Sequence, residues 1–159
     1  FEELCGNKPT HFIGCSAQPA IEVEYALAEE GVKYITQAKL CMYPLGDGDY
    51  KRAYYWLGRI SKKTGQMALM RNGWFEPMHR KYDYVDTCMS DIALAFKYHK
   101  PCIISSHRAN FCGRIVPENA YNGLNTLDKL LGTIIKTWPD VEFMTSTELG
   151  EIIRKEKGL

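Results

Sequence analysis

Short apolar runs recur along this chain, and stretches with helical spacing of apolar residues separate them. Four of the runs have the length and composition of buried strands: residues 10–15, 32–36, 101–106 and 141–145. Two further β-like runs, 53–60 and 66–72, flank the sequence "SKKTG" and predict a hairpin with Gly65 in its turn. The segment 41–49, "CMYPLGDGD", is rich in proline, glycine and aspartate, and we interpret it as a loop.

Four stretches predict helices, and each has a start or stop signal. They begin near Pro19, Asp83, Asn122 and Thr145. Gly31 suits the left-handed residue that ends the first helix, Pro139 ends the third, and Thr145 with Glu148 predicts a capping box for the fourth. The order of strands and helices predicts an α/β fold with a mainly parallel sheet and flanking helices.

Composition narrows the class of protein. The 159 residues predict a single domain, 1–159, and a 45% hydrophobic content is typical of a globular core. Lysine and arginine number 20 against 19 acids, so the charge signature of nucleic-acid binding is absent. We see no run of about 18 apolar residues and thus expect no membrane span. Because the chain opens on Phe1, we expect a processed chain or a fragment, and its localisation is not predicted.

The six cysteines show none of the paired spacings typical of zinc or redox motifs. They lie at positions 5, 15, 41, 88, 102 and 112. Most have apolar neighbours, so we interpret them as buried free thiols, while the even count leaves disulfides open.

Polar residues directly follow the strand in "PCIISSHRANFCG". In parallel sheets, ligands bind at the carboxyl ends of strands, which makes this loop a candidate site. His107 can exchange a proton near neutral pH, as general acid catalysis requires. Arg108 either binds an anionic ligand or pairs with Glu76, and Asn110 either contacts substrate or braces the loop. A nucleophilic pair of Cys112 with His107 is a less favoured alternative, because no orienting acid is identified.

The second polar cluster is "RNGWFEP" at 71–77. Trp74 and Phe75 either stack against a sugar ring or fill the core, and Arg71, Asn72 and Glu76 are candidates to bind its hydroxyls. Glu76 is the carboxylate that would act as a base or pair with His107. A glycosidase-like site using Glu76 lacks an evident second carboxylate.

Four segments resemble polysaccharide deacetylase-like proteins over nearly the whole chain. They are "FEELCGNKPTHFIG", "LAEEGVKYI", "RNGWFEP" and the run from Lys100 to Ile153, which is the most specific. The resemblance is to the C-terminal half of these proteins, of which the nodulation-type carbohydrate deacetylases are examples. It implies part of a distorted (β/α)7 barrel and metal-dependent removal of acetyl groups from a glycan.

The resemblance also implies roles for individual residues. "SSH" at 105–107 matches the family's final histidine motif, so His107 would protonate the leaving amine or alcohol. The backbone N–H of Cys15 or Ser16 would bind the oxyanion, although "IGCSAQP" lacks the family's arginine and aromatic residue. The family implies a divalent metal, with zinc the first choice, whose ligands would precede this segment and are absent from it.

Two hypotheses follow from these residues. The first is part of a carbohydrate deacetylase that acts on acetylated glycans and is inactive as this isolated segment. The second is a non-catalytic glycan-binding or scaffolding domain that retains the barrel without the metal chemistry. Because a partial barrel leaves strand edges at "THFIG" and "VEFMT", we also predict homo-oligomer formation through them.

Overall fold

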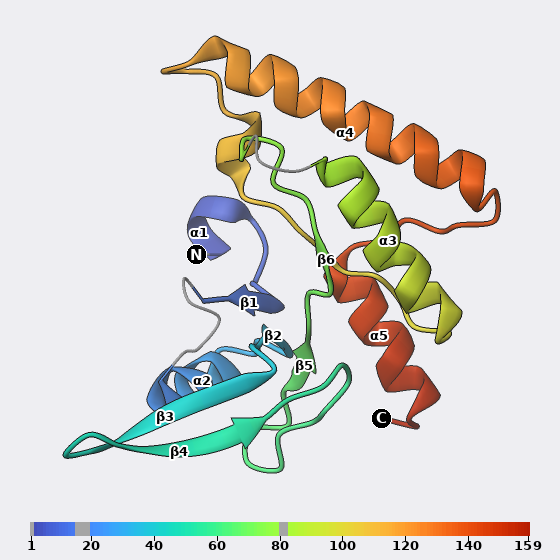
Figure 1. Ribbon diagram of the computed structural model, residues 1–159. Helices are drawn as coiled ribbons and strands as arrows, with labels where there is room; N and C mark the ends of the chain where they lie inside the picture. The colour runs from blue at the N-terminus through green and yellow to red at the C-terminus, as the bar shows by residue number, and fades with distance from the viewer. Residues whose placement is uncertain (1, 15–19, 80–82) are drawn as a thin grey trace. The chain divides into compact units, whose positions relative to one another are not determined.

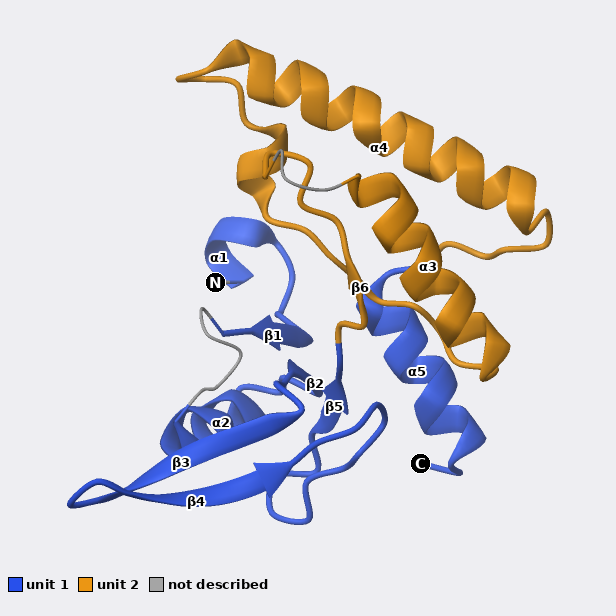
Figure 2. Ribbon diagram, in the orientation of Figure 1, with its two compact units in different colours: residues 1–70, 144–159 blue, residues 71–143 orange. Residues whose placement is uncertain are grey.

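The structure is a computed structural model that describes residues 2–14, 20–79 and 83–159. The chain divides into two compact units, residues 1–70 with 144–159 and residues 71–143 (Figure 2). The prediction of one domain over 1–159 stays a prediction.

Unit 1 contains a parallel three-stranded sheet in the order β1-β2-β5. Its elements in chain order are α1 (Glu2–Cys5), β1 (His11–Ile13), α2 (Ile21–Glu29), β2 (Tyr34–Thr36), β3 (Leu40–Gly46), β4 (Asp49–Tyr54), β5 (Met67–Leu69) and α5 (Ser146–Glu156). The predicted strand, helix and parallel strand at the start of the chain are confirmed by β1, α2 and β2. Gly31 follows α2 with φ of 85°, as expected for a residue beyond a helix end.

The interpretation of residues 41–49 as a loop is wrong. β3 and β4 pair antiparallel and form a long hairpin, labelled in Figure 1. Asp47 and Gly48 join them with φ of 50° and 83°, the two positive values that a tight type I′ turn requires. Pro44 is accommodated next to a register irregularity in this two-stranded ribbon. The proline and glycines therefore mark a turn and an irregularity within strands.

The hairpin predicted for 53–60 and 66–72 is mostly wrong as well. Residues 53–54 belong to β4, and β5 pairs in parallel with β2. The expected antiparallel contact is limited to a bridge between Ile60 and Met67, beside a turn in which Gly65 has φ of 70°.

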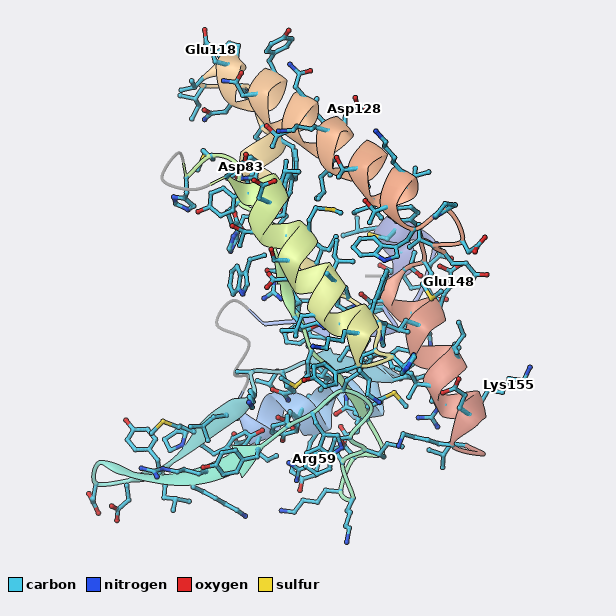
Figure 3. All side chains as sticks on the ribbon, turned by 45° about the vertical axis from the view of Figure 1, so that its right-hand side comes forward. Arg59, Asp83, Glu118, Asp128, Glu148 and Lys155 are labelled. Carbon is cyan, nitrogen blue, oxygen red and sulfur yellow. The ribbon has the colours of Figure 1, made fainter. Side chains whose placement is uncertain are left out.

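Helix α5 begins where the sequence predicts. The Thr145 side chain accepts a hydrogen bond from the N–H of Glu148, and Glu148 accepts from the N–H of Thr145, so the capping box is confirmed. In Figure 3, Glu148 is labelled at the start of α5 and Lys155 near its end. Gly150 faces the ring of Tyr34, where a Cβ would overlap that ring, so α5 approaches the sheet closely at this position.

Unit 2 contains a two-stranded parallel sheet and two long helices (Figure 1). Its elements are β6 (Gly73–Trp74), α3 (Tyr84–Lys97), β7 (Ile104–Ser105), the 3-10 helix η1 (Arg108–Phe111) and α4 (Pro117–Thr137). Asp83 caps α3 by accepting from the N–H groups of Val85 and Asp86, as predicted. The core lies between β6, β7 and the helices and contains Phe75, Val85, Cys88, Ile92, Leu130 and Ile134.

Two predictions in and beside this unit are wrong. Helix α4 begins at Pro117 instead of near Asn122, because proline is already set for the first helical position. Residues 141–145 form no strand, since they pair with no strand of the described chain, and Phe143 is exposed.

The mixed α/β class is therefore confirmed, with small parallel sheets, one antiparallel hairpin and helices. Within residues 2–14, 20–79 and 83–159 the strands form separate sheets and no closed barrel. In that same part of the chain, no helix is both long and apolar enough to cross a bilayer.

Candidate functional site

The parallel strands β6 and β7 bring two loops together in unit 2. Gly73 pairs with Ile104 and Trp74 with Ser105, and the N–H of Phe75 donates to the carbonyl of Ser105 at 2.9 Å. Because the strands run in the same direction, the segments that follow them leave the sheet at the same edge. The residues after β6 therefore meet the polar residues after β7 at one end of this sheet.

Glu76 and His107 form the centre of the site. Nδ1 of His107 lies 2.7 Å from Oε1 of Glu76, and the N–H of His107 donates to the same oxygen at 3.1 Å. Glu76 is only 6% exposed, whereas the His107 side chain is 69% exposed. Since a carboxylate only accepts, Nδ1 carries the proton in this pair, and Nε2 is left to exchange a proton with a ligand.

Asn110 completes the support of the buried carboxylate. Its Nδ2 donates to Oε2 of Glu76 at 2.6 Å and to the carbonyl of His107 at 2.8 Å. Its Oδ1 accepts from the N–H of Met78 at 3.0 Å, and the residue is 1% exposed. Of the two roles considered for Asn110, this geometry favours bracing the loop. A buried charge needs such donors, because an unpaired carboxylate in a protein interior is strongly unfavourable.

The two aromatic side chains of "RNGWFEP" point in opposite directions, as successive side chains in a strand do. Phe75 is buried in the core between α3 and α4, while Trp74 is 54% exposed. Successive side chains in extended backbone point to opposite faces, so Trp74 points away from the core that Phe75 enters. The N–H of Trp74 donates to Oδ2 of Asp91 on α3 at 3.0 Å, a contact that no signal in the sequence indicates.

Arg71 and Asn72 precede β6 and so lie at its other end from Glu76. Asn72 is engaged with the backbone before β7: its Nδ2 donates to the carbonyl of Pro101 at 3.1 Å, and its Oδ1 accepts from the N–H of Ile103 at 2.7 Å. The structure thus brings Trp74, Glu76 and His107 to one end of the sheet and leaves Arg71 and Asn72 before it. Their predicted contacts with substrate stay predictions.

The remaining predicted site residues are placed as follows. Arg108 begins η1, and Glu76 pairs with His107 and Asn110 instead of with Arg108 in the described chain. Ligand binding by Arg108 stays a prediction. Cys15 and Ser16, the predicted oxyanion donors, lie outside the described residues.

Two cysteines of unit 2, Cys88 and Cys102, are protonated thiols. Burial raises the pKa of Cys88 to about 12 and that of Cys102 to about 11, so both thiols stay protonated at neutral pH. Cys112 is exposed, and Nδ1 of His107 bonds to Glu76, so a nucleophilic pair of Cys112 with His107 stays a prediction. The cysteines that the structure describes, at 5, 41, 88, 102 and 112, are free thiols, of which 41 and 88 are buried.

A metal ligand set does not occur in the described ranges. No group of three or more His, Cys, Asp or Glu side chains in residues 2–14, 20–79 and 83–159 could hold a metal ion. Glu76 and His107 supply two such groups, which bind each other. Because the resemblance places the metal ligands before this segment, the divalent metal stays a prediction.

Comparisons with known proteins add no relative to this description. No family model matches the chain, and neither the curated proteins nor the solved structures contain a match. The functional argument therefore depends on the geometry of the site itself.

Proposed function

We propose that this chain is part of a hydrolase that removes acetyl groups from glycans, with His107 as its general acid. The observation that carries the proposal is the 2.7 Å contact between Nδ1 of His107 and the buried carboxylate of Glu76, beside an exposed imidazole. A carboxylate that fixes the tautomer and orientation of a histidine is a recurring arrangement in acid–base catalysis.

In the proposed reaction, water adds to the acetyl carbonyl carbon and the bond from that carbon to the sugar nitrogen or oxygen breaks. Nε2 of His107, which carries no proton while Nδ1 donates to Glu76, first accepts a proton from the attacking water. As general acid it then passes this proton to the leaving nitrogen or oxygen, which departs as an amine or alcohol, and the acetic acid formed ionises to acetate. Glu76 and Asn110 are positioning residues, because they contact the imidazole and its loop and not the acetyl group. No step is assigned to a metal ion.

The finer fold belongs to the same proposal. We place the parallel strands β1, β2, β5, β6 and β7 in a distorted (β/α)7 barrel of the deacetylase type. The parallel pairing within each of the two sheets supports it, with α2 between β1 and β2 and α3 between β6 and β7. Association of copies through β1, an outer strand of the described sheet, is likewise part of the proposal.

The direct test is release of acetate by the full-length protein from acetylated glycans, such as acetylated chitin oligomers and acetylated xylan. We expect acetate to accumulate in proportion to free amine or hydroxyl on the glycan. An absence of acetate with all acetylated glycans, from folded protein supplied with zinc, would contradict the proposal.

The Glu76→Gln variant tests the positioning role. Glutamine keeps the size of the side chain but presents an amide, so we expect turnover to fall by about tenfold to a hundredfold. Nitrogen NMR of the His107 ring should show the proton distributed over both ring nitrogens, whereas it resides on Nδ1 in the unchanged protein. A role that is only structural would alter stability and leave the ring tautomer of the folded protein unchanged.

The exposed indole of Trp74 favours the second candidate function, a glycan-binding domain without catalysis. A flat aromatic side chain that is 54% exposed is suited to stacking on a sugar ring. This function predicts glycan binding that falls about tenfold or more in Trp74→Ala and is unchanged by a chelator. Isothermal titration with and without chelator measures both effects. Tyr98→Ala, which removes an exposed aromatic residue beyond the end of α3, is the control.

A further inference from the structure

Unit 1 contains a cavity of about 930 Å³ that the proposed function does not use. The β3–β4 hairpin, α2, residues 55–63 and the last residues of the chain line it. Figure 3 labels Arg59, which lies in the segment after β4. None of the residues of the His107 site line this cavity, so the two sites share no side chain.

The floor of the cavity contains a buried carboxylate. Glu24 on α2 is 3% exposed, and its Oε1 accepts from Nε2 of Gln37 at 2.9 Å and from the hydroxyl of Tyr43 at 2.7 Å. No donor in the described chain bonds to Oε2 of Glu24. Since Glu24 lines the cavity, this second oxygen is available to accept a hydrogen bond from a ligand.

Two tyrosines extend the floor. The hydroxyl of Tyr43 gives its proton to Glu24, so the 2.7 Å contact between Tyr43 and Tyr55 has the Tyr55 hydroxyl as donor. Burial raises the pKa of Tyr43 and of Tyr55, and both hydroxyls stay neutral. The Tyr55 hydroxyl proton is used in the hydrogen bond to Tyr43. The Tyr55 oxygen is therefore left to accept a hydrogen bond from a ligand. The floor therefore selects a ligand that donates hydrogen bonds.

The rest of the lining is basic. It contains the cations Lys51, Arg59, Lys62, Lys63 and Lys157, and the one acidic side chain among the lining residues is that of Glu24. The ion pairs of the described chain use other residues, so none of these cations is neutralised by a carboxylate there. The whole chain has a net charge of only +1, so positive charge is concentrated at this cavity.

Arg59 and Trp56 form an ordered edge of the cavity. The guanidinium lies over the rings of Tyr55 and Trp56, with its carbon 4.6 Å and 5.0 Å from their centroids, and donates to the carbonyl of Tyr54. Stacking of this kind holds a guanidinium in place and leaves its other N–H groups to bind an anion. Trp56 remains 59% exposed and offers a flat apolar surface beside the cations.

We propose that this cavity binds a sugar ring that carries an anionic group, as a uronic acid or a sugar phosphate does. Hydroxyl groups of the ring donate to Glu24 and Tyr55 at the floor, and the anionic group faces the lysines and Arg59. The buried carboxylate fixes the orientation, because it repels an anion placed at the floor. This proposal is independent of the proposed deacetylation.

Isothermal titration at low ionic strength tests the proposal with three probes: glucuronic acid, glucose 6-phosphate and glucose. We expect at least one anionic sugar to bind more tightly than glucose, with an affinity that falls as salt is added. In Lys62→Gln/Lys63→Gln we expect that affinity to fall about tenfold or more, because contacts to charged groups are lost. Tyr55→Phe should lower it by about threefold to tenfold.

The matched control is Lys129→Gln/Lys155→Gln, which removes the same charge from exposed positions outside the lining. It should bind as the unchanged protein does. Comparison of the two anionic sugars identifies whether carboxylate or phosphate is preferred. The proposal is overturned if neither anionic sugar binds more tightly than glucose, or if the control loses as much affinity as Lys62→Gln/Lys63→Gln.

Discussion

Replacing His107 by alanine is expected to lower the turnover of acetylated glycan by about a hundredfold or more. The reason is the loss of the proton that the leaving nitrogen or oxygen needs as the acyl bond breaks. Glu76 keeps its donor from Asn110 in this variant, so the loops should stay folded. Acetate release under saturating substrate measures turnover, and far-ultraviolet circular dichroism checks the fold.

The control for this experiment is His99→Asn. His99 follows α3 with φ of 52°, a conformation that asparagine tolerates, and precedes β7, whereas His107 follows it. We expect this variant to keep its turnover. Normal turnover in folded His107→Ala would exclude His107 as the general acid and would favour the binding function of Trp74.

The second large effect is expected for Gly123→Ala on α4. A Cβ at Gly123 would overlap the carbonyl oxygen of Asn110 and lie 2.9 Å from its carbonyl carbon. Backbone atoms cannot rotate away, so either α4 or η1 must move, and we expect the free energy of unfolding to fall by about 3 kcal/mol. Because η1 carries Asn110, the support of Glu76 should weaken and activity should fall as well. Urea denaturation measures the first effect.

Gly132→Ala provides the matched control on the same helix. No heavy atom lies within 4 Å of a Cβ at this position. Alanine has the higher helix propensity, so this change should raise stability by up to about 1 kcal/mol. Equal effects of the two substitutions would contradict the close contact between α4 and η1.

Local signals predicted the helices better than the strands. Asp83 and Thr145 bond to N–H groups within their own first turn, so the starts of α3 and α5 depend only on neighbouring residues. A strand depends on a partner elsewhere in the chain. Residues 141–145 have a strand-like sequence but no partner in the described ranges, and 41–49 form strands despite their turn-rich composition. The Asp47–Gly48 dipeptide is the signal in the sequence that indicates the β3–β4 hairpin.

The candidate site was predictable in part for a similar reason. An apolar strand followed by polar residues placed His107 at a strand end without any knowledge of its neighbours. The choice of His107 over Arg108 as the partner of Glu76 depends on the pairing of Trp74 with Ser105, which the sequence does not specify. The same register, together with alternation, buries Phe75 and exposes Trp74.

The shared carboxylate of Glu76 has a consequence for motion in unit 2. Donors from the segment after β7 converge on a residue of the segment after β6, and Asn110 bonds back to Met78. Separating the two segments would leave the buried Glu76 carboxylate without its hydrogen-bond donors, which is strongly unfavourable. The two segments should fluctuate as one rigid body, and any gating that admits a polymer to the imidazole must come from other parts of the protein.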